Sequence, residues 1–223
     1  IIDDITPLRK IEASMLNANL TFFETKPFII SEKSNFGGTA LSNQFVGDNP
    51  SSDALISYFL PKRHTFGKMT AEIIDTAGNL VSKLEAGKLK GVNTISWSFN
   101  GLAPKVAKGK GMSFAGAPTV KAGTYKLRIN KGNEVFEKEI AVEYDPNSTF
   151  TLAERNAQQL VTEELFDMIQ DLAYFVYQID KWDETVATYQ QKNSAPNKVV
   201  SKLDLELDAL RNKLVVTTGD NYV

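Results

Sequence analysis

The sequence predicts an α+β fold in which β-strands come first and helices follow. Short runs with alternating apolar residues recur between positions 54 and 144. The pattern changes abruptly at Asp145-Pro146, and apolar residues then recur every three or four positions over 165–214. We therefore expect an Ig-like or fibronectin-III-like antiparallel β-sandwich followed by an antiparallel helical hairpin.

The sandwich is predicted from short β-rich runs separated by turns. The runs lie at 55–60, 69–74, 80–84, 93–99, 123–129 and 135–144. A short turn around Lys131-Gly132-Asn133 joins the last two as a hairpin. Trp97 lies on an alternating strand that would bury it between two sheets. The Gly- and Lys-rich stretch 102–120 offers few apolar anchors, so we expect a long, mobile loop there.

A long amphipathic helix is predicted after Pro146. Ser148 or Thr151 can cap it, and Glu154 lies three residues beyond Thr151 in capping-box spacing. Its apolar stripe consists of Leu165, Ile169, Leu172, Val176, Ile179, Trp182 and Val186. This helix carries more apolar surface than one partner helix covers, so a third helix or a neighbouring domain is expected against it.

A second helix is predicted after the interruption at Ser194-Ala195-Pro196-Asn197. Its apolar face consists of Val200, Leu203, Leu207, Leu210 and Leu214. The domain limits expected from these patterns are an edge strand and linker at 1–24, the sandwich at 25–146, and the hairpin at 147–223, truncated at its C-terminus. Because the chain enters directly on Ile1 without an initiator Met, we expect it to be an excerpt of something larger.

Composition is that of an ordinary globular protein. The chain has 223 residues, of which 42% are apolar and 23% charged, and its formal net charge of -2 gives no field that would attract nucleic acid or an anionic membrane. No window approaches the roughly 18 apolar residues of a membrane span, and no signal peptide is visible at the N-terminus. With no Cys and only His64, thiolate and multi-His metal sites are excluded, and no cofactor or metal is expected.

Acidic residues offer no recognisable catalytic constellation. Asp3 and Asp4 are adjacent on a predicted strand, so their carboxylates point to opposite faces. Asp48, Asp53 and Asp75 lack the Asp-x-Asp-x-Asp spacing of a calcium loop and are better explained as turn formers. His64 follows a strand among charged residues and has no nucleophile near it in sequence. The residues therefore predict a chain that is not an enzyme.

Aromatic residues fall into two predicted groups. The core group consists of Trp97, Tyr125 and Phe136, which lie on alternating strands. The possible contact group consists of Phe36, Phe66 and Phe114, which lie in predicted loops where an exposed ring can stack on a sugar or dock on a neighbouring domain. We favour interdomain contact, because no cluster of polar partners surrounds these rings in sequence.

Three segments resemble a known family. They are Ile2-Asp3-Asp4-Ile5-Thr6-Pro7-Leu8-Arg9, the run Asn49-Pro50-Ser51-Ser52-Asp53-Ala54-Leu55-Ile56-Ser57-Tyr58-Phe59-Leu60, and Val120-Lys121-Ala122-Gly123-Thr124-Tyr125. They look like the C-terminal region of large bacterial sortilin-like β-propeller proteins, which carry Asp-box (BNR-type) repeats and are often labelled glycosyl hydrolases. The sandwich part is similar to the Ig-like domain of flagellar hook-capping proteins.

The resemblance implies a non-catalytic accessory or scaffold module of a secreted or periplasmic protein. Residues 2–9 would close the last propeller blade, and the module would pack against that β-propeller or a protein partner. An isolated fragment is then expected to self-associate through exposed apolar surface. Two alternatives stay open: a carbohydrate-binding sandwich that uses Phe36 and Phe114, and a glycoside hydrolase fragment, which needs two carboxylates about 5 to 10 Å apart.

Overall fold

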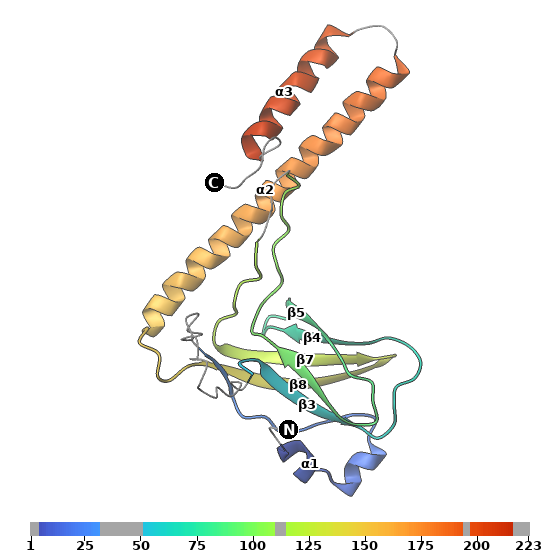
Figure 1. Cartoon of the computed structure of the whole chain (residues 1–223), viewed down its shortest axis with the longest axis vertical. Coiled ribbons are helices and arrows are strands. Elements are labelled where there is room, and N and C mark those ends of the chain that lie inside the picture. The colour runs from blue at the N-terminus through green and yellow to red at the C-terminus, as the bar shows by residue number, and fades with distance from the viewer. Residues whose placement is uncertain (1–4, 32–50, 110–114, 194–196, 216–223) are drawn as a thin grey trace, which may run out of the picture. The chain divides into compact units, whose positions relative to one another are not determined.

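The computed structural model describes residues 5–31, 51–109, 115–193 and 197–215 (Figure 1). It divides into two compact units. The first comprises residues 1–102 and 119–151, and the second comprises residues 103–118 and 152–223. Strands make up most of the regular structure of the first unit and two long helices that of the second, so the predicted α+β class is confirmed.

The first unit contains two β-sheets. One has the strand order β1-β3-β6 and the other β2-β8-β7-β4-β5. The strands are β1 (Thr21–Phe22), β2 (Phe28–Ile30), β3 (Ala54–Leu60), β4 (Met69–Ile74), β5 (Leu80–Glu85), β6 (Gly91–Trp97), β7 (Gly123–Lys131) and β8 (Glu134–Tyr144). Each of the six predicted strands lies on one of β3 to β8, and β7 and β8 form the predicted hairpin.

The expectation of a wholly antiparallel sandwich is wrong at β2. This short strand was not predicted, and it pairs in parallel with the end of β8, with Phe28 beside Val142 and Ile30 beside Tyr144. Pro27 immediately precedes this strand, and a proline is tolerated at the first residue or the edge of a sheet. The larger sheet is therefore mixed.

One apolar core fills the space between the two sheets. Inward-facing positions alternate along β3, β6 and β7, and they are almost fully buried. At its centre Trp97 is 1% exposed and contacts the rings of Phe99 and Tyr125, each with ring centroids 5.4 Å apart. The polar ends are satisfied: Trp97 Nε1 donates to the Asn100 carbonyl at 3.0 Å, and the Tyr125 hydroxyl donates to the Lys121 carbonyl at 2.8 Å. Trp97 and Tyr125 are core residues, as predicted, and Phe136 packs against the same core.

The N-terminal segment is not the simple edge strand and linker expected from sequence. It forms a short helix α1 (Thr6–Arg9), a 3₁₀ helix η1 (Ala13–Asn17) and then β1, which pairs antiparallel with β3. Pro7 lies in the first turn of α1, where its missing N–H costs nothing. Leu20 and Phe23 on either side of β1 are buried, so this end of the segment belongs to the sandwich.

The second unit contains the helices α2 (Leu152–Lys192) and α3 (Lys198–Leu214). Asn197 caps α3, because its side-chain oxygen accepts hydrogen bonds from the backbone N–H groups of Val199 and Val200. The two helices run antiparallel, because contacts move toward the start of α2 as they move toward the end of α3. Gln190 donates a hydrogen bond to Asp204, and Arg211, further along α3, donates one to Asp180, which lies earlier on α2. The predicted hairpin is therefore present.

The loop expected at 102–120 belongs largely to the helical unit. It leaves and re-enters the sandwich at an isolated bridge between Asn100 and Thr119. Residues 103–109, which we call the strap, lie along α2. The Lys108 carbonyl accepts a hydrogen bond of 3.1 Å from Arg211 Nη2 on α3. Sequence reasoning missed this role, because the strap has neither periodicity nor many apolar residues.

Candidate functional site

Of the three predicted contact aromatics, the structure describes Phe66. Its side chain is 87% exposed in the segment between β3 and β4. That segment is fixed to the β5–β6 connection, because the backbone N–H of His64 donates to the Lys88 carbonyl and Lys88 Nζ donates to the Gly67 carbonyl. Phe36 and Phe114 lie outside the described residues, as do Asp3, Asp4 and Asp48.

His64 offers an unusual but weak chemical feature in the same turn. Its Nε2 atom is buried without a hydrogen-bond partner among the described residues, although the side chain as a whole is only partly buried. No nucleophile or carboxylate contact to this nitrogen is present in the described structure.

The described Asp residues of the sandwich stabilise local structure. Asp75 Oδ1 accepts from the backbone N–H groups of Ala77 and Asn79 at 2.9 and 2.8 Å, and its Oδ2 accepts from Asn79 Nδ2. These hydrogen bonds from Asn79 and the turn amides hold the pKa of Asp75 below its ordinary value. Asp53 accepts a hydrogen bond of 2.6 Å from Ser96 across the β3–β6 pair. Asp75 therefore acts as a turn former, as predicted, whereas the carboxylate of Asp53 contacts Ser96 on the neighbouring strand.

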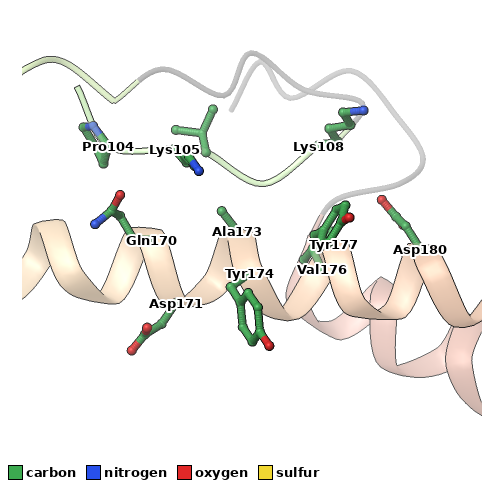
Figure 2. Close-up of a pocket in the computed structure, with 11 residues that line it drawn as sticks. Pro104, Lys105, Lys108, Gln170, Asp171, Ala173, Tyr174, Val176, Tyr177 and Asp180 are labelled. Atoms are coloured by element: carbon green, nitrogen blue, oxygen red, sulfur yellow. The ribbon is translucent and has the colours of Figure 1, made fainter. Parts of the chain in front are cut away.

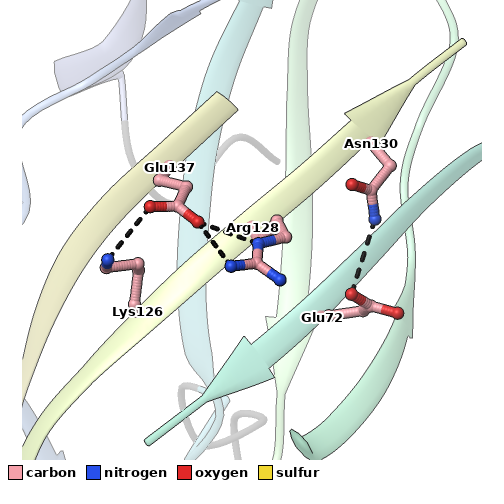
Figure 3. A network of polar contacts seen from close by, with 5 residues as sticks. All are labelled: Glu72, Lys126, Arg128, Asn130 and Glu137. Atoms are coloured by element: carbon pink, nitrogen blue, oxygen red, sulfur yellow. Dashed lines mark hydrogen bonds and ion pairs between the residues drawn. The ribbon is translucent and has the colours of Figure 1, made fainter. Parts of the chain in front are cut away.

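Charged side chains on the larger sheet form a cross-strand network (Figure 3). Glu137 on β8 lies between Lys126 and Arg128 of β7, at 3.0 and 2.8 Å, and these two cations lower its pKa. On the next strand pair, Asn130 donates to Glu72 at 3.4 Å. Such pairs fix strand register on an exposed face rather than create a reactive group. Within the described residues, no cluster of three or more His, Cys, Asp or Glu residues is placed to hold a metal ion.

A concave feature of the helical unit lies between the strap and α2 (Figure 2). This open pocket has a volume of about 870 Å³. Its lining residues are Pro104, Lys105, Val106, Lys108, Gln170, Asp171, Ala173, Tyr174, Val176, Tyr177 and Asp180. Gln170, Ala173 and Asp180 face the strap, whereas Asp171 and Tyr174 point away from it. Val176 is only 1% exposed. The strap thus covers one side of the middle of α2.

The N-terminal half of α2 carries apolar side chains that are more than half exposed. Val161, Leu165, Met168 and Phe175, which we call the open stripe, are 53–60% exposed. Their spacing of three and four residues puts them on one helix face, and the same face continues through Ile179 and Val186. Those last two residues are buried against Leu207 of α3. The open stripe is therefore the continuation of a face that is already an interface.

The length difference between the helices explains why the stripe is open. At about 1.5 Å per residue, the 41 residues of α2 span about 60 Å, whereas the 17 residues of α3 span about 25 Å. The ion pair between Asp180 and Arg211, at 2.8 Å, lies near the end of α3, so the N-terminal half of α2 extends beyond it. The sequence predicted this excess of apolar surface, but not which residues of α2 would remain uncovered.

An acidic group interrupts the buried face between the helices. Asp183 occupies a position on the α3-facing side of α2, and its Oδ1 atom is buried without a hydrogen-bond partner in the described part of the chain. Burial, and then the nearby carboxylates of Asp208, Asp180 and Asp204, raise the pKa of Asp183, while Arg211 opposes the shift. This arrangement destabilises the folded hairpin at neutral pH.

No protein-family model, curated protein or solved structure matches this chain. Among the described helices, none has the combination of length and apolar content that crossing a bilayer requires. The open stripe is thus the candidate functional site, because its exposed apolar side chains continue an interface that the helical unit already uses.

Proposed function

We propose that the chain is a non-catalytic accessory module of a larger secreted or periplasmic β-propeller protein. Its sandwich is an Ig-like or fibronectin-III-like domain, and its helical unit packs against the propeller or a protein partner. The observation that carries the proposal is the open stripe, whose four apolar side chains are more than half exposed on a face that α3 covers further along.

Burial energetics support a docking role for this face. Covering a half-exposed Leu, Val, Met or Phe side chain contributes about 1 kcal/mol, since full burial of such a side chain contributes about 1.5 to 3 kcal/mol. The inward-facing apolar residues of the sandwich already lie within one buried core, so docking is not required to bury them. Its described acidic residues Asp53, Asp75 and Glu137 are engaged in structural contacts, which favours a module without catalytic chemistry.

The reading frame around the codons for this segment gives the first test. We expect Asp-box repeats of a β-propeller before the codon for Ile1. The separately expressed propeller, or another domain of the same protein, should then bind this 223-residue chain in a calorimetric titration. A reading frame without a propeller would overturn the proposed parent, and a propeller and neighbouring domains that all fail to bind would overturn the docking role.

A carbohydrate-binding sandwich is the second candidate, favoured by the 87% exposed ring of Phe66. A glycan array followed by calorimetry tests it, with the variants Phe66→Ala and Phe36→Ala/Phe114→Ala beside the unchanged chain. Saturable glycan binding that is lost in either variant supports sugar stacking. Absence of binding by the unchanged chain removes this candidate.

A further inference from the structure

The open stripe has the geometry of a helix-binding face. Its residues follow the three- and four-residue spacing that, further along α2, receives Leu207 and Leu214 of α3. An occupant that continues this interface is therefore a helix lying against Val161–Phe175 of α2, with apolar residues at the same spacing.

Charge distinguishes among possible helices. Between Leu152 and Phe175 the acidic residues are Glu154, Glu163, Glu164, Asp167 and Asp171. The basic residue of this segment is Arg155. Glu164 and Asp171 are seven residues apart, so they lie on the same flank of the stripe, and both are exposed. A second copy of this chain would bring the same acidic segment against itself, which electrostatic repulsion disfavours.

The strap shows how the chain covers the adjoining part of this helix. It carries Lys105 and Lys108, and residues 103–109 contain no acidic side chain. It lies over the segment of α2 that includes Asp180 and the buried Val176 (Figure 2). An apolar segment with lysines thus already covers one part of the acidic helix α2 in the same molecule.

We propose that the open stripe binds an amphipathic helix of a partner, with apolar residues at heptad spacing and Lys or Arg along its flanks. The inference rests on the proposed docking function and names what docks. The apolar stripe supplies the affinity, while Glu164 and Asp171 select the basic flank and exclude a second copy of this chain.

Two synthetic 24-residue helical peptides test the proposal against the whole chain. Both carry the same leucine stripe, and their flanking positions are all Lys in one and all Glu in the other. At low ionic strength we expect calorimetry to give one site for the Lys-flanked peptide, at least about tenfold tighter than for the Glu-flanked peptide. The difference should shrink as salt is raised to about 0.5 M.

Matched variants localise the binding. Leu165→Lys should weaken the Lys-flanked peptide at least about tenfold, whereas Leu205→Lys, on the outer face of α3 where the leucine is 70% exposed, should leave it unchanged. The double variant Glu164→Lys/Asp171→Lys should reverse the preference toward the Glu-flanked peptide. Circular dichroism checks that each variant keeps its helical signal, and the charge-swap pair changes only exposed residues.

Three results would overturn the inference. The first is equal affinity of the chain for the two peptides. The second is an equal loss of affinity for the Lys-flanked peptide in Leu165→Lys and in Leu205→Lys. The third is sedimentation of the free chain as a dimer that Leu165→Lys converts to a monomer. The last result would assign the stripe to a second copy. If the propeller binds but Leu165→Lys leaves that binding intact, this inference fails while the proposed function stands. If the reading frame lacks a propeller but the peptides bind as expected, the proposed parent protein is wrong while this inference stands.

Discussion

The sandwich and the helical hairpin differ in how completely each closes its own apolar surface. In the described part of the sandwich, sixteen buried residues from both sheets form one core. In the helical unit the corresponding cluster has three buried residues, Ile179, Val186 and Leu207. A sheet pair encloses a volume between two faces, whereas a helix pair encloses a seam only as long as its shorter member. The sandwich is therefore self-sufficient, and the helical unit presents a surface for another molecule.

The two units also differ in how they use carboxylates. In the sandwich, Asp75 and Glu137 accept hydrogen bonds from turn amides or cations that lower their pKa values. In the helical unit, Asp183 is partly buried among other carboxylates that raise its pKa. The first arrangement stabilises the folded unit at neutral pH, and the second destabilises it.

The largest expected effect is the loss of sandwich stability in Leu127→Ala. Leu127 is fully buried between the sheets, so its truncation leaves a cavity that costs about 4 kcal/mol. Urea unfolding followed by Trp97 fluorescence in a Trp182→Phe background measures this cost. Leu55→Ala, at a position 48% exposed on β3, is the matched control and should cost less than about 1 kcal/mol. Similar costs for both would contradict a single closed core.

A smaller effect is expected in the hairpin from Leu207→Asp. Leu207 is 5% exposed in the seam, and a carboxylate there would be buried beside Ile179 and Val186 without a partner, at a cost of about 3 kcal/mol. The helical signal in circular dichroism should melt at lower temperature, while Trp97 fluorescence still reports a folded sandwich. Leu205→Asp on the outer face is the control. An unchanged helical melt in Leu207→Asp would refute the α2–α3 packing.

A third comparison concerns the turn at Asp75. Replacement by Ala removes the acceptor of three hydrogen bonds and should lower the free energy of unfolding of the sandwich by less than either core substitution does. Asp75→Asn keeps a side-chain oxygen for the turn amides and should cost less. Trp97 fluorescence during urea unfolding measures both variants. Equal costs for Ala and Asn would show that the hydrogen bonds do not stabilise the turn.

Sequence patterns predicted the sandwich strands because each element there satisfies one local rule. Strands β6 and β7 alternate buried and exposed positions, and β3 is a short run of mostly apolar residues that favour strands. Strands β1 and β2 have two and three residues, too few to show a period, and were missed. The parallel pairing of β2 with β8 depends on contacts distant in sequence, which a local pattern does not contain.

The candidate site could be predicted only in part for a related reason. Helical periodicity predicted an excess of apolar surface on α2 over what one helix covers. The predicted stripe contains Leu165 of the open stripe but not Val161, Met168 or Phe175, because the length of α3 decides which residues stay open. Trp182 was expected on the buried face, yet it is 53% exposed, whereas Asp183 beside it lies on the α3-facing side. The three- and four-residue spacing can be continued at residue 182 or at residue 183. The apolar side chain of Trp182 favoured residue 182, whereas Asp183 is the residue that faces α3. Of the predicted contact aromatics, Phe66 is exposed as expected.

The smallest expected effect comes from Asp183→Asn, and it should be stabilising. Asn removes the charge that faces Asp208, Asp180 and Asp204, so the free energy of unfolding of the helical unit should rise slightly at neutral pH, because solvent screens much of the repulsion at this partly exposed position. The helical melt in circular dichroism measures it. Asp167→Asn, an exposed carboxylate on the same helix, is the matched control and should change the melt less.

Lowering the pH should change the stability of the two units in opposite directions, through Asp183 in the helical unit and through Asp75 and Glu137 in the sandwich. The raised pKa of Asp183 means that the folded helical unit binds this proton more tightly than the unfolded chain, so its stability should rise as pH falls through that pKa toward the ordinary value of 3.8. The lowered pKa values of Asp75 and Glu137 have the opposite sign, and sandwich stability should fall once pH drops below their ordinary values of 3.8 and 4.5. Melts monitored by helical circular dichroism and by Trp97 fluorescence should therefore diverge between neutral pH and about 4. Asp183→Asn should reduce the rise in the helical unit and leave the sandwich curve unchanged. A rise of the same size in both chains would assign it to other carboxylates and refute the role of Asp183.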